Sequence, residues 1–297
     1  MTETASHIPV LLGKVIEIMA PAPNKNFIDA TGGPGNMSRA ILKRTGPLGR
    51  MLTLDIDPRI SAEQEKILGE FGSRSVRRLA NFSRIKEIAE SEGFVPCDGI
   101  LFDLGLSSAM IDRGEYGMSF THDGPLDMRM DPSSPITAEK LVNELTEKEL
   151  SELFRKVDER RFALKIARAI VGARDRKPIR TTSQLASIIA DAVPKRYWPR
   201  NMHVATRPFL AIRIAVNREE KNLETALRDC HDILADSRVL IAICYSSFED
   251  RIVKAEIGSR RDRWERLVKK PIKPEADEVE RNPRSRSARL RAYAKVA

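Results

Sequence analysis

The alternation of short apolar runs and helix-like stretches over the first hundred residues restricts the fold of this chain more than any other feature. Apolar runs lie at 27–28, 51–54, 76–79 and 99–102. Between them, stretches such as 60–71 and 82–89 have the period of helices. This alternation predicts an α/β domain in which helices cover a parallel sheet.

The middle of the chain has a different pattern. Four stretches between 138 and 235 have helical period with no strand signal between them: TEKELSELF, ERRFALKIARAIVGA, TTSQLASIIADAV and ATRPFLAIRIAVN. Strand character returns at 239–245 and in the last ten residues. We therefore expect residues 1–110 and 205–297 to form one α/β domain, and residues 111–204 to form an inserted all-helical domain.

The composition is that of a globular protein, with 41% hydrophobic and 31% charged residues. No apolar run approaches the roughly 18 residues that a membrane helix needs, and the first residues, MTETASH, lack the pattern of a signal peptide. Cys97, Cys230 and Cys244 have no metal-ligand spacing. We expect a cytoplasmic protein with reduced, buried thiols and no metal.

The net charge of +9 is unevenly distributed along the chain. Residues 250–297 carry 15 Lys and Arg against 8 Asp and Glu, a balance of +7, whereas residues 1–249 carry 36 against 34. A basic C-terminal end favours a polyanionic partner such as RNA. The alternative is a solvated basic tail.

The segment FIDATGGPGNMSRAIL, residues 27–42, joins the first predicted strand to a helix through a glycine-rich loop. Gly33 and Gly35 have the spacing of a strand-to-helix turn that lets the backbone approach a ligand closely. Asp55 lies at the end of the next predicted strand, where an acid can accept hydrogen bonds from ribose hydroxyls. These residues predict a site for a cofactor that contains a nucleoside.

Three acids, Asp29, Asp55 and Asp103, end predicted strands, and ligands of open α/β sheets bind at the carboxyl ends of the strands. A dinucleotide would place a pyrophosphate on the glycine loop, where Asp29 would repel it. S-adenosylmethionine has no phosphate, and its ammonium group could pair with Asp29. The spacing therefore favours S-adenosylmethionine, with a nicotinamide dinucleotide as the alternative.

Several strings resemble one protein family over nearly the whole chain: HIPVLL at 7–12, GPLDMRMD at 124–131, RRFALKIARAIV at 160–171, ATRPFLAIRIAVN at 205–217, SSFEDRIVK at 246–254 and NPRSRSARLR at 282–291. The chain is similar to the MraW/RsmH family of S-adenosylmethionine-dependent rRNA methyltransferases. The resemblance implies a Rossmann-like class I methyltransferase domain with a helical insert. It also implies methylation of the exocyclic N4 of a cytidine in small-subunit rRNA, bacterial or organellar, within the small subunit.

The resemblance also implies which residues hold the cofactor. Besides Gly33 and the ribose acid Asp55, they are Gly35, Asn36 and Met37 in the loop, Phe82 beside the adenine, and Asp103 and Met110 after the fourth strand. Asp103 either accepts the N4 hydrogens of the target base or only orients the cofactor.

The chain departs from the family pattern at five positions. The family has glycine and histidine where this chain has Asn36 and Met37, glutamine at the positions of Met110 and Leu210, and histidine at the position of Ser246. These departures favour an alternative function, that of a catalytically weak relative that binds rRNA as an assembly factor.

Two polar patterns remain. In PLDMRM, Asp127 and Arg129 alternate with apolar residues, and this pair either meets the RNA or forms an internal ion pair. The C-terminal SARLRAYAKV alternates too, which predicts a half-buried strand with Arg and Tyr293 on its outer face. We expect four arginines here to bind RNA: Arg284, Arg286, Arg289 and Arg291.

Overall fold

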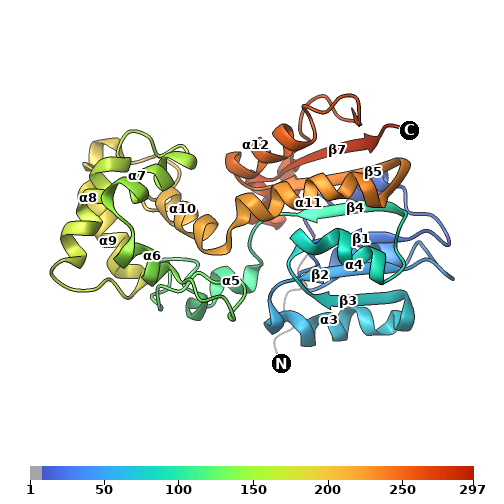
Figure 1. The fold of residues 1–297 in the computed structure, drawn as a ribbon, viewed down its shortest axis with the longest axis horizontal. Helices are drawn as coiled ribbons and strands as arrows, with labels where there is room; N and C mark the ends of the chain where they lie inside the picture. Colours follow the sequence, from blue (N-terminus) through green and yellow to red (C-terminus); the bar gives the residue numbers. More distant parts are fainter. Residues whose placement is uncertain (1–8) are drawn as a thin grey trace. The chain divides into compact units, whose positions relative to one another are not determined.

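The computed structural model describes residues 9–297, which form two compact units (Figure 1). Unit 1 contains the described residues up to Gly105 together with Glu220–Ala297, and unit 2 contains Leu106–Glu219. Unit 1 is the α/β part and unit 2 is helical, as the two patterns in the sequence predict.

Unit 1 is built on a sheet whose strand order is β3-β2-β1-β4-β5-β7-β6. The strands β1 to β5 are parallel, and β7 runs antiparallel to both β5 and β6. Their bounds are β1 Phe27–Asp29, β2 Met51–Asp55, β3 Ser75–Leu79, β4 Cys97–Asp103, β5 Leu234–Cys244, β6 Trp264–Arg266 and β7 Arg289–Lys295. This topology confirms the predicted α/β methyltransferase-like fold.

Helices cover both faces of the sheet, and Figure 1 shows α4 and α11 lying across its strands. A continuous apolar core joins α1, α2 and α3 to the strands through side chains such as Val15, Ile41, Leu68, Phe27 and Ile241. The helices of unit 1 are α1 Leu12–Met19, α2 Asn36–Leu42, α3 Ser61–Leu68, α4 Ile85–Ser91, α11 Glu219–Ile233, α12 Ser247–Glu256 and α13 Ala276–Arg281. The central strands read as continuous apolar runs because both of their faces are buried.

Unit 2 consists of helices joined by loops and short 3₁₀ turns. Capping boxes begin two of its helices, with Thr146 and Glu149 at α7 and Thr181 and Gln184 at α9. The helices are α5 Ser108–Asp112, α6 Ala138–Glu144, α7 Glu147–Lys156, α8 Ala163–Arg174, α9 Thr182–Ala192 and α10 Thr206–Asn217. Buried side chains such as Leu150, Phe154 and Ile166 form the core between them.

The predicted boundaries of the insert differ from the division in the structure. We expected residues 205–217 to belong to the α/β domain, but these residues form α10, which packs against α6 and α7 in unit 2. The reason is the apolar face of α10, which buries Phe209, Ile212 and Val216. Helical period alone cannot show which of two neighbouring cores such a face joins.

The three cysteines are buried and carry free thiols, as expected. No helix among residues 9–297 is long and apolar enough to span a bilayer. Within the same residues, no cluster of three or more His, Cys, Asp or Glu side chains could hold a metal ion.

Candidate functional site

Three aspartates lie at the carboxyl edge of the sheet in unit 1. The adjacent parallel strands β2, β1 and β4 end at Asp55, Asp29 and Asp103. In the register, Asp29 pairs with Thr53 and Leu101, so Asp55 and Asp103 lie two residues further along on either side of it. The three predicted acids therefore share one edge of the sheet.

The glycine loop turns between β1 and α2 through two left-handed residues. Gly33 has φ 50° and Gly35, the N-cap of α2, has φ 101°, which L side chains rarely adopt. A Cβ atom at Gly32 would lie 2.1 Å from Cγ2 of Thr53, whereas one at Gly33 would meet nothing closer than 3.9 Å. The loop thus packs on β2 at Gly32 and leaves open space beside the backbone of Gly33.

Asp55 fastens this loop to the second strand. Its Oδ2 accepts a hydrogen bond from the backbone N–H of Gly33 at 2.8 Å, and its Oδ1 accepts one from Asp57 at 2.9 Å. From α3, the Gln64 amide donates to the carbonyl of Gly33 at 2.8 Å. Each carboxylate oxygen has two lone pairs, so Asp55 retains acceptor capacity for a pair of hydroxyls.

The carboxylate of Asp29 forms hydrogen bonds within the protein, whereas the sequence suggested that it could pair with the ammonium group of the cofactor. Its side chain is buried, and its two oxygens accept hydrogen bonds from the N–H of Thr31 at 3.2 Å and the hydroxyl of Ser38 at 2.7 Å. Asp29 therefore shapes the loop from beneath and contributes negative charge to its surroundings.

Asp103 has a partner that the sequence did not reveal. The hydroxyl of Tyr245, directly after β5, donates to Oδ1 of Asp103 at 2.8 Å. A Cβ atom at Gly105 would lie 3.0 Å from the Tyr245 ring, so the glycine makes room for it. The backbone N–H of Asp103 also donates to Oγ1 of Thr31 at 2.6 Å. These contacts hold the end of β4 in one conformation.

Burial raises the pKa of all three aspartates. The pKa of Asp29 and Asp55 rises to about 6, and that of Asp103 to about 7, because desolvation disfavours the charged form. Hydrogen bonds oppose the shift in each case, and the charge of Asp29 adds to it at Asp55 and Asp103. A cation bound at this edge would relieve the repulsion, so the edge suits a positively charged ligand.

Two loop residues behave differently from the expectation based on the sequence. Asn36, which stands where the family has glycine, is the first residue of α2, and the positive φ of the turn belongs to Gly35, so no left-handed backbone is required of Asn36. The side chain of Met37 is buried in the apolar core of unit 1. Met37 therefore reaches a ligand at the loop through its backbone only.

The remaining predicted residues of the cofactor site lie in both units. Phe82 is half-buried in unit 1 and makes an edge-to-face contact with Phe102, with ring centroids 5.9 Å apart. Met110 in α5 and Leu210 in α10 belong to unit 2, where Met110 is buried. Ser246 is the N-cap of α12 and forms a capping box with Glu249.

The predicted basic face of the C-terminal strand is wrong for its central residues. β5 and β6 pair with the two edges of β7, and its residues from Leu290 to Ala294 are all buried, Tyr293 included, so both faces of the strand are covered. Arg291 is only 7% exposed and forms a bidentate ion pair with Asp250 of α12, with distances of 2.5 and 3.1 Å. Arg291 is therefore a structural residue.

The other three predicted RNA-binding arginines keep accessible side chains. Arg284 and Arg286 are exposed, and Arg289 is half-buried. Arg289 lines an open cleft together with Lys270 and Lys273. This end of unit 1 therefore still offers positive charge at its surface.

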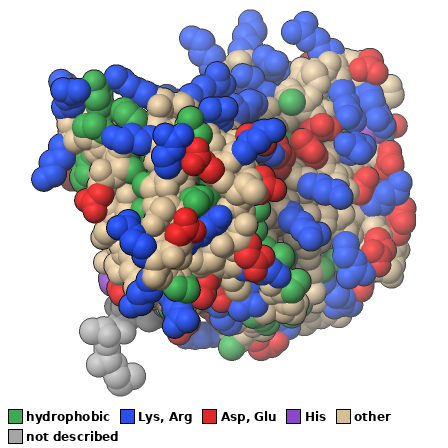
Figure 2. All heavy atoms as spheres, turned by 60° about the vertical axis from the view of Figure 1, so that its left-hand side comes forward, with side chains coloured by type: hydrophobic (Ala, Val, Ile, Leu, Met, Phe, Trp, Pro, Cys, Tyr) green, Lys and Arg blue, Asp and Glu red, His purple; other side chains and the backbone are tan. Residues whose placement is uncertain are grey.

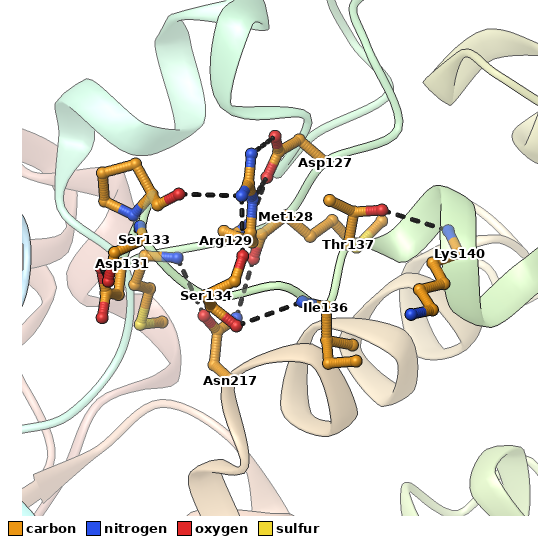
Figure 3. Close-up of polar contacts among 12 residues, drawn as sticks. Asp127, Met128, Arg129, Asp131, Ser133, Ser134, Ile136, Thr137, Lys140 and Asn217 are labelled. Carbon is orange, nitrogen blue, oxygen red and sulfur yellow. Dashed lines mark hydrogen bonds and ion pairs between the residues drawn. The ribbon is translucent and has the colours of Figure 1, made fainter.

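The Asp127–Arg129 pair is an internal ion pair within unit 2 (Figure 3). Nε and Nη2 of Arg129 each donate to the Asp127 carboxylate at 2.8 Å. Its Nη1 donates to the carbonyls of Pro132 at 2.8 Å and Ser134 at 2.7 Å. The guanidinium thus closes the loop on itself, which favours the structural interpretation of this pair.

Asn217 holds the same loop from the end of α10, as Figure 3 shows. Its Nδ2 donates to the carbonyl of Met128 at 2.8 Å, and its Oδ1 accepts the N–H of Met130 at 2.8 Å. Met128 has φ 60°, a strained value for a residue with a side chain. The two hydrogen bonds of the Asn217 side chain therefore stabilise the backbone turn at Met128.

Sequence reasoning missed Gln64, Tyr245 and Asp250. Gln64 and Asp250 lie inside ordinary helical stretches, and no short motif links them to a loop or strand that is distant in the sequence. Tyr245 did carry a signal, because it is the last residue of the apolar strand that we predicted at 239–245, at the edge where ligands bind.

Comparison with known proteins gives one consistent result. The model of the MraW methylase family matches residues 4–296. A protein named ribosomal RNA small subunit methyltransferase H from Thermomicrobium roseum is 40% identical, and the alignment covers 99% of this chain and 95% of that protein. The protein of the same name from Syntrophobacter fumaroxidans is also 40% identical, with 97% and 96% covered. Both units are included in these matches.

Proposed function

The chain belongs to the MraW methylase family, and on this premise we propose that it is an S-adenosylmethionine-dependent methyltransferase acting on small-subunit rRNA. The proposed product is a cytidine methylated on its exocyclic N4. One observation carries the proposal: a left-handed glycine turn occurs together with three aspartates, Asp29 buried and Asp55 and Asp103 half-buried, at the carboxyl edge of the sheet.

The residues at this edge fit the cofactor. Asp55 retains acceptor capacity for both ribose hydroxyls, and the open space at Gly33 admits a ligand against the backbone. Phe82 offers a half-buried aromatic ring for the adenine. The buried carboxylates supply the negative charge that a sulfonium and an ammonium group require. When bound, S-adenosylmethionine supplies a methyl group on positively charged sulfur.

Asp103 is the residue that we propose to act on the target base. Tyr245 occupies Oδ1 and stays protonated, because burial raises its pKa. Within the part of the chain that the structure describes, Oδ2 of Asp103 has no hydrogen-bond partner, so it can accept a hydrogen of the N4 amine. Asp103 would orient the amine towards the methyl donor when the cofactor is bound, and it would face the proton that the amine loses on methylation. A carboxylate with a pKa of about 7 can take that proton near neutral pH.

The substrate is proposed to be rRNA within the assembled small subunit, in the bacterial cytoplasm or in an organelle. The target base must leave its stack to approach a methyl group held at the sheet edge, at a cost of a few kcal/mol. Arg284, Arg286 and Arg289 are proposed to contribute phosphate contacts in unit 1.

The decisive experiment measures tritium transfer from S-adenosylmethionine to small subunits that lack the modification, followed by nucleoside mass spectrometry for N4-methylcytidine. Asp55→Ala should weaken cofactor binding at least roughly tenfold, because a hydrogen bond to a charged group is worth about 1.5–3 kcal/mol. Glu63→Ala, which removes an exposed carboxylate from α3, is the matched control.

A second function is favoured by the five departures from the family pattern, at Asn36, Met37, Met110, Leu210 and Ser246. A chain that binds rRNA but neither binds S-adenosylmethionine nor transfers its methyl group would be an assembly factor. That result would overturn the enzyme proposal. Methyl transfer to cytidine N4 would exclude the assembly-factor reading.

A further inference from the structure

A cluster of two arginines and two aromatic rings lies on the surface of unit 2; we call Arg161, Phe162, Arg196 and Tyr197 the arginine–aromatic patch. The guanidinium carbon of Arg161 lies 3.9 Å from the centroid of the Tyr197 ring, and that of Arg196 lies 4.9 Å from it. The rings of Phe162 and Tyr197 are 5.4 Å apart. Both guanidinium groups therefore lie within cation–π distance of the Tyr197 ring.

The backbone beneath the patch is well anchored. Residues Lys195–Tyr197 form a 3₁₀ turn, and the next residue, Trp198, donates its indole N–H to the carbonyl of Val193 at 2.9 Å. The Trp198 ring packs edge-to-face on His203 at 5.2 Å. The patch is thus built on an ordered segment, which fixes the position of Tyr197.

The charge of the patch is not neutralised by the protein. Arg161 and Arg196 are exposed, and within residues 9–297 neither forms an ion pair with a carboxylate. No acidic residue occurs in the sequence between Asp191 and Glu219. Two other arginines of unit 2, Arg168 and Arg180, are also exposed but are paired. Nη2 of Arg168 lies 3.2 Å from a carboxylate oxygen of Glu147, and Nε of Arg180 lies 4.0 Å from one of Glu139.

Exposed apolar surface accompanies this charge. Tyr197 is 36% exposed, Met202 is 42% exposed and Leu164 is 45% exposed. Figure 2 shows that Lys and Arg side chains are frequent on the surface and that exposed hydrophobic side chains lie beside some of them. Flat aromatic and guanidinium surfaces next to unpaired positive charge are the combination that binds unstacked bases and their phosphates.

We propose that the arginine–aromatic patch binds an unpaired segment of RNA. This inference rests on the proposed function, because it names a second surface for the same rRNA substrate. The cation–π contact with Tyr197 holds each guanidinium beside the ring and leaves its N–H groups able to donate to phosphate oxygens. The outer faces of the stacked groups then accept a base. A duplex hides its bases and would use only the charge.

The first test measures the affinity of the full-length protein for a fluorescently labelled single-stranded dodecamer of mixed-sequence RNA at several KCl concentrations. Removing two phosphate contacts from a single strand should flatten the slope of log affinity against log salt by about 1.4. We therefore expect that change for Arg161→Ala with Arg196→Ala, together with at least a tenfold loss of affinity. The control, Arg168→Ala with Arg180→Ala, removes the same charge from paired positions and should change the slope less than half as much.

The second test separates stacking from charge. Tyr197→Leu keeps both arginines, so the salt slope should be unchanged, while affinity for the dodecamer falls at least about fivefold. Tyr197→Phe keeps the ring and should bind like the wild type. A hairpin duplex of equal charge should not distinguish Tyr197→Leu from the wild type.

The outcomes distinguish this inference from the proposed function. If the wild type transfers methyl groups and binds the dodecamer, but the double alanine variant matches its control, the patch inference fails and the enzyme proposal stands. If the wild type binds neither the dodecamer nor small-subunit rRNA, both fail. A thermal midpoint within a degree of the wild type shows that each variant is folded, as expected for exposed side chains.

Discussion

The two units of this protein hold unneutralised charge of opposite sign in opposite environments. In unit 1, Asp29 is buried and Asp55 and Asp103 are half-buried at the edge of the sheet, and desolvation raises the pKa of all three. In unit 2, Arg161 and Arg196 are exposed and stacked on an aromatic ring. The aspartates suit a small cationic ligand that binds at the carboxyl edge of the sheet. The arginines suit a large anion that binds on the surface of unit 2.

Paired charges elsewhere in the molecule show the contrast. Arg291 is neutralised by Asp250, and Arg129 by Asp127, and both pairs fix local structure. A charge that the protein itself compensates stabilises the fold, whereas a charge left uncompensated is available to a ligand. Counting basic residues along the sequence cannot make this distinction.

The largest effect is expected from breaking the buried pair. Arg291→Ala leaves the carboxylate of Asp250 buried without a partner, which should destabilise the protein by about 3–5 kcal/mol. Urea unfolding followed by circular dichroism measures this loss. Arg161→Ala, at an exposed position, should change the free energy of unfolding by less than about 0.5 kcal/mol. Equal effects of the two substitutions would contradict the contrast.

The positions that were predicted correctly and those that were missed differ in a physical way. The strand ends and the glycine turn were predictable because buried parallel strands read as apolar runs and because Gly33 and Gly35 mark a left-handed turn. The burial of Arg291 was not predictable, because strand alternation showed that the strand has two faces but not that α12 packs on the face that carries Arg291. Its partner, Asp250, is 41 residues away in the sequence.

The insert illustrates the same limit. Its helices were predictable from their period and from capping residues such as Thr146 and Thr181. The arginine–aromatic patch joins Arg161, before α8, to Tyr197, after α9. No local pattern connects these two positions, so only the folded unit reveals that they form one surface.

A smaller effect is expected from titrating the acidic edge. With a pKa of about 6 for Asp55 and about 7 for Asp103, ionisation between pH 5.5 and 8 should strengthen S-adenosylmethionine binding, by up to about tenfold per pH unit for each proton released on binding. Calorimetric titration across this range measures the change. S-adenosylhomocysteine, which lacks the charge on sulfur, should show a weaker dependence on pH.

The control for this titration is Asp103→Asn, which should flatten the pH profile of S-adenosylmethionine binding. The ligand-free protein should respond in the opposite sense. Since the folded pKa values are raised, the edge favours the folded state most below about pH 4 and loses that contribution as pH rises through 6 and 7. A constant ratio of the two ligand affinities from pH 5.5 to 8 would mean that the acids do not sense the sulfonium.

The smallest effect is expected from replacing one guanidinium by an ammonium group. Arg161→Lys keeps the positive charge, so the slope of log affinity against log salt should match that of the wild type. Lysine cannot lie flat on the Tyr197 ring while donating two parallel hydrogen bonds, so affinity for single-stranded RNA should fall by about two- to fivefold. Arg168→Lys, at a paired position, should leave affinity unchanged. If Arg161→Lys binds like the wild type, charge alone explains the patch and Tyr197 serves only to hold the chain. If Arg161→Lys instead binds as weakly as Arg161→Ala and has the same flatter salt slope, the contact between the guanidinium and the Tyr197 ring is required to place the positive charge at the phosphate.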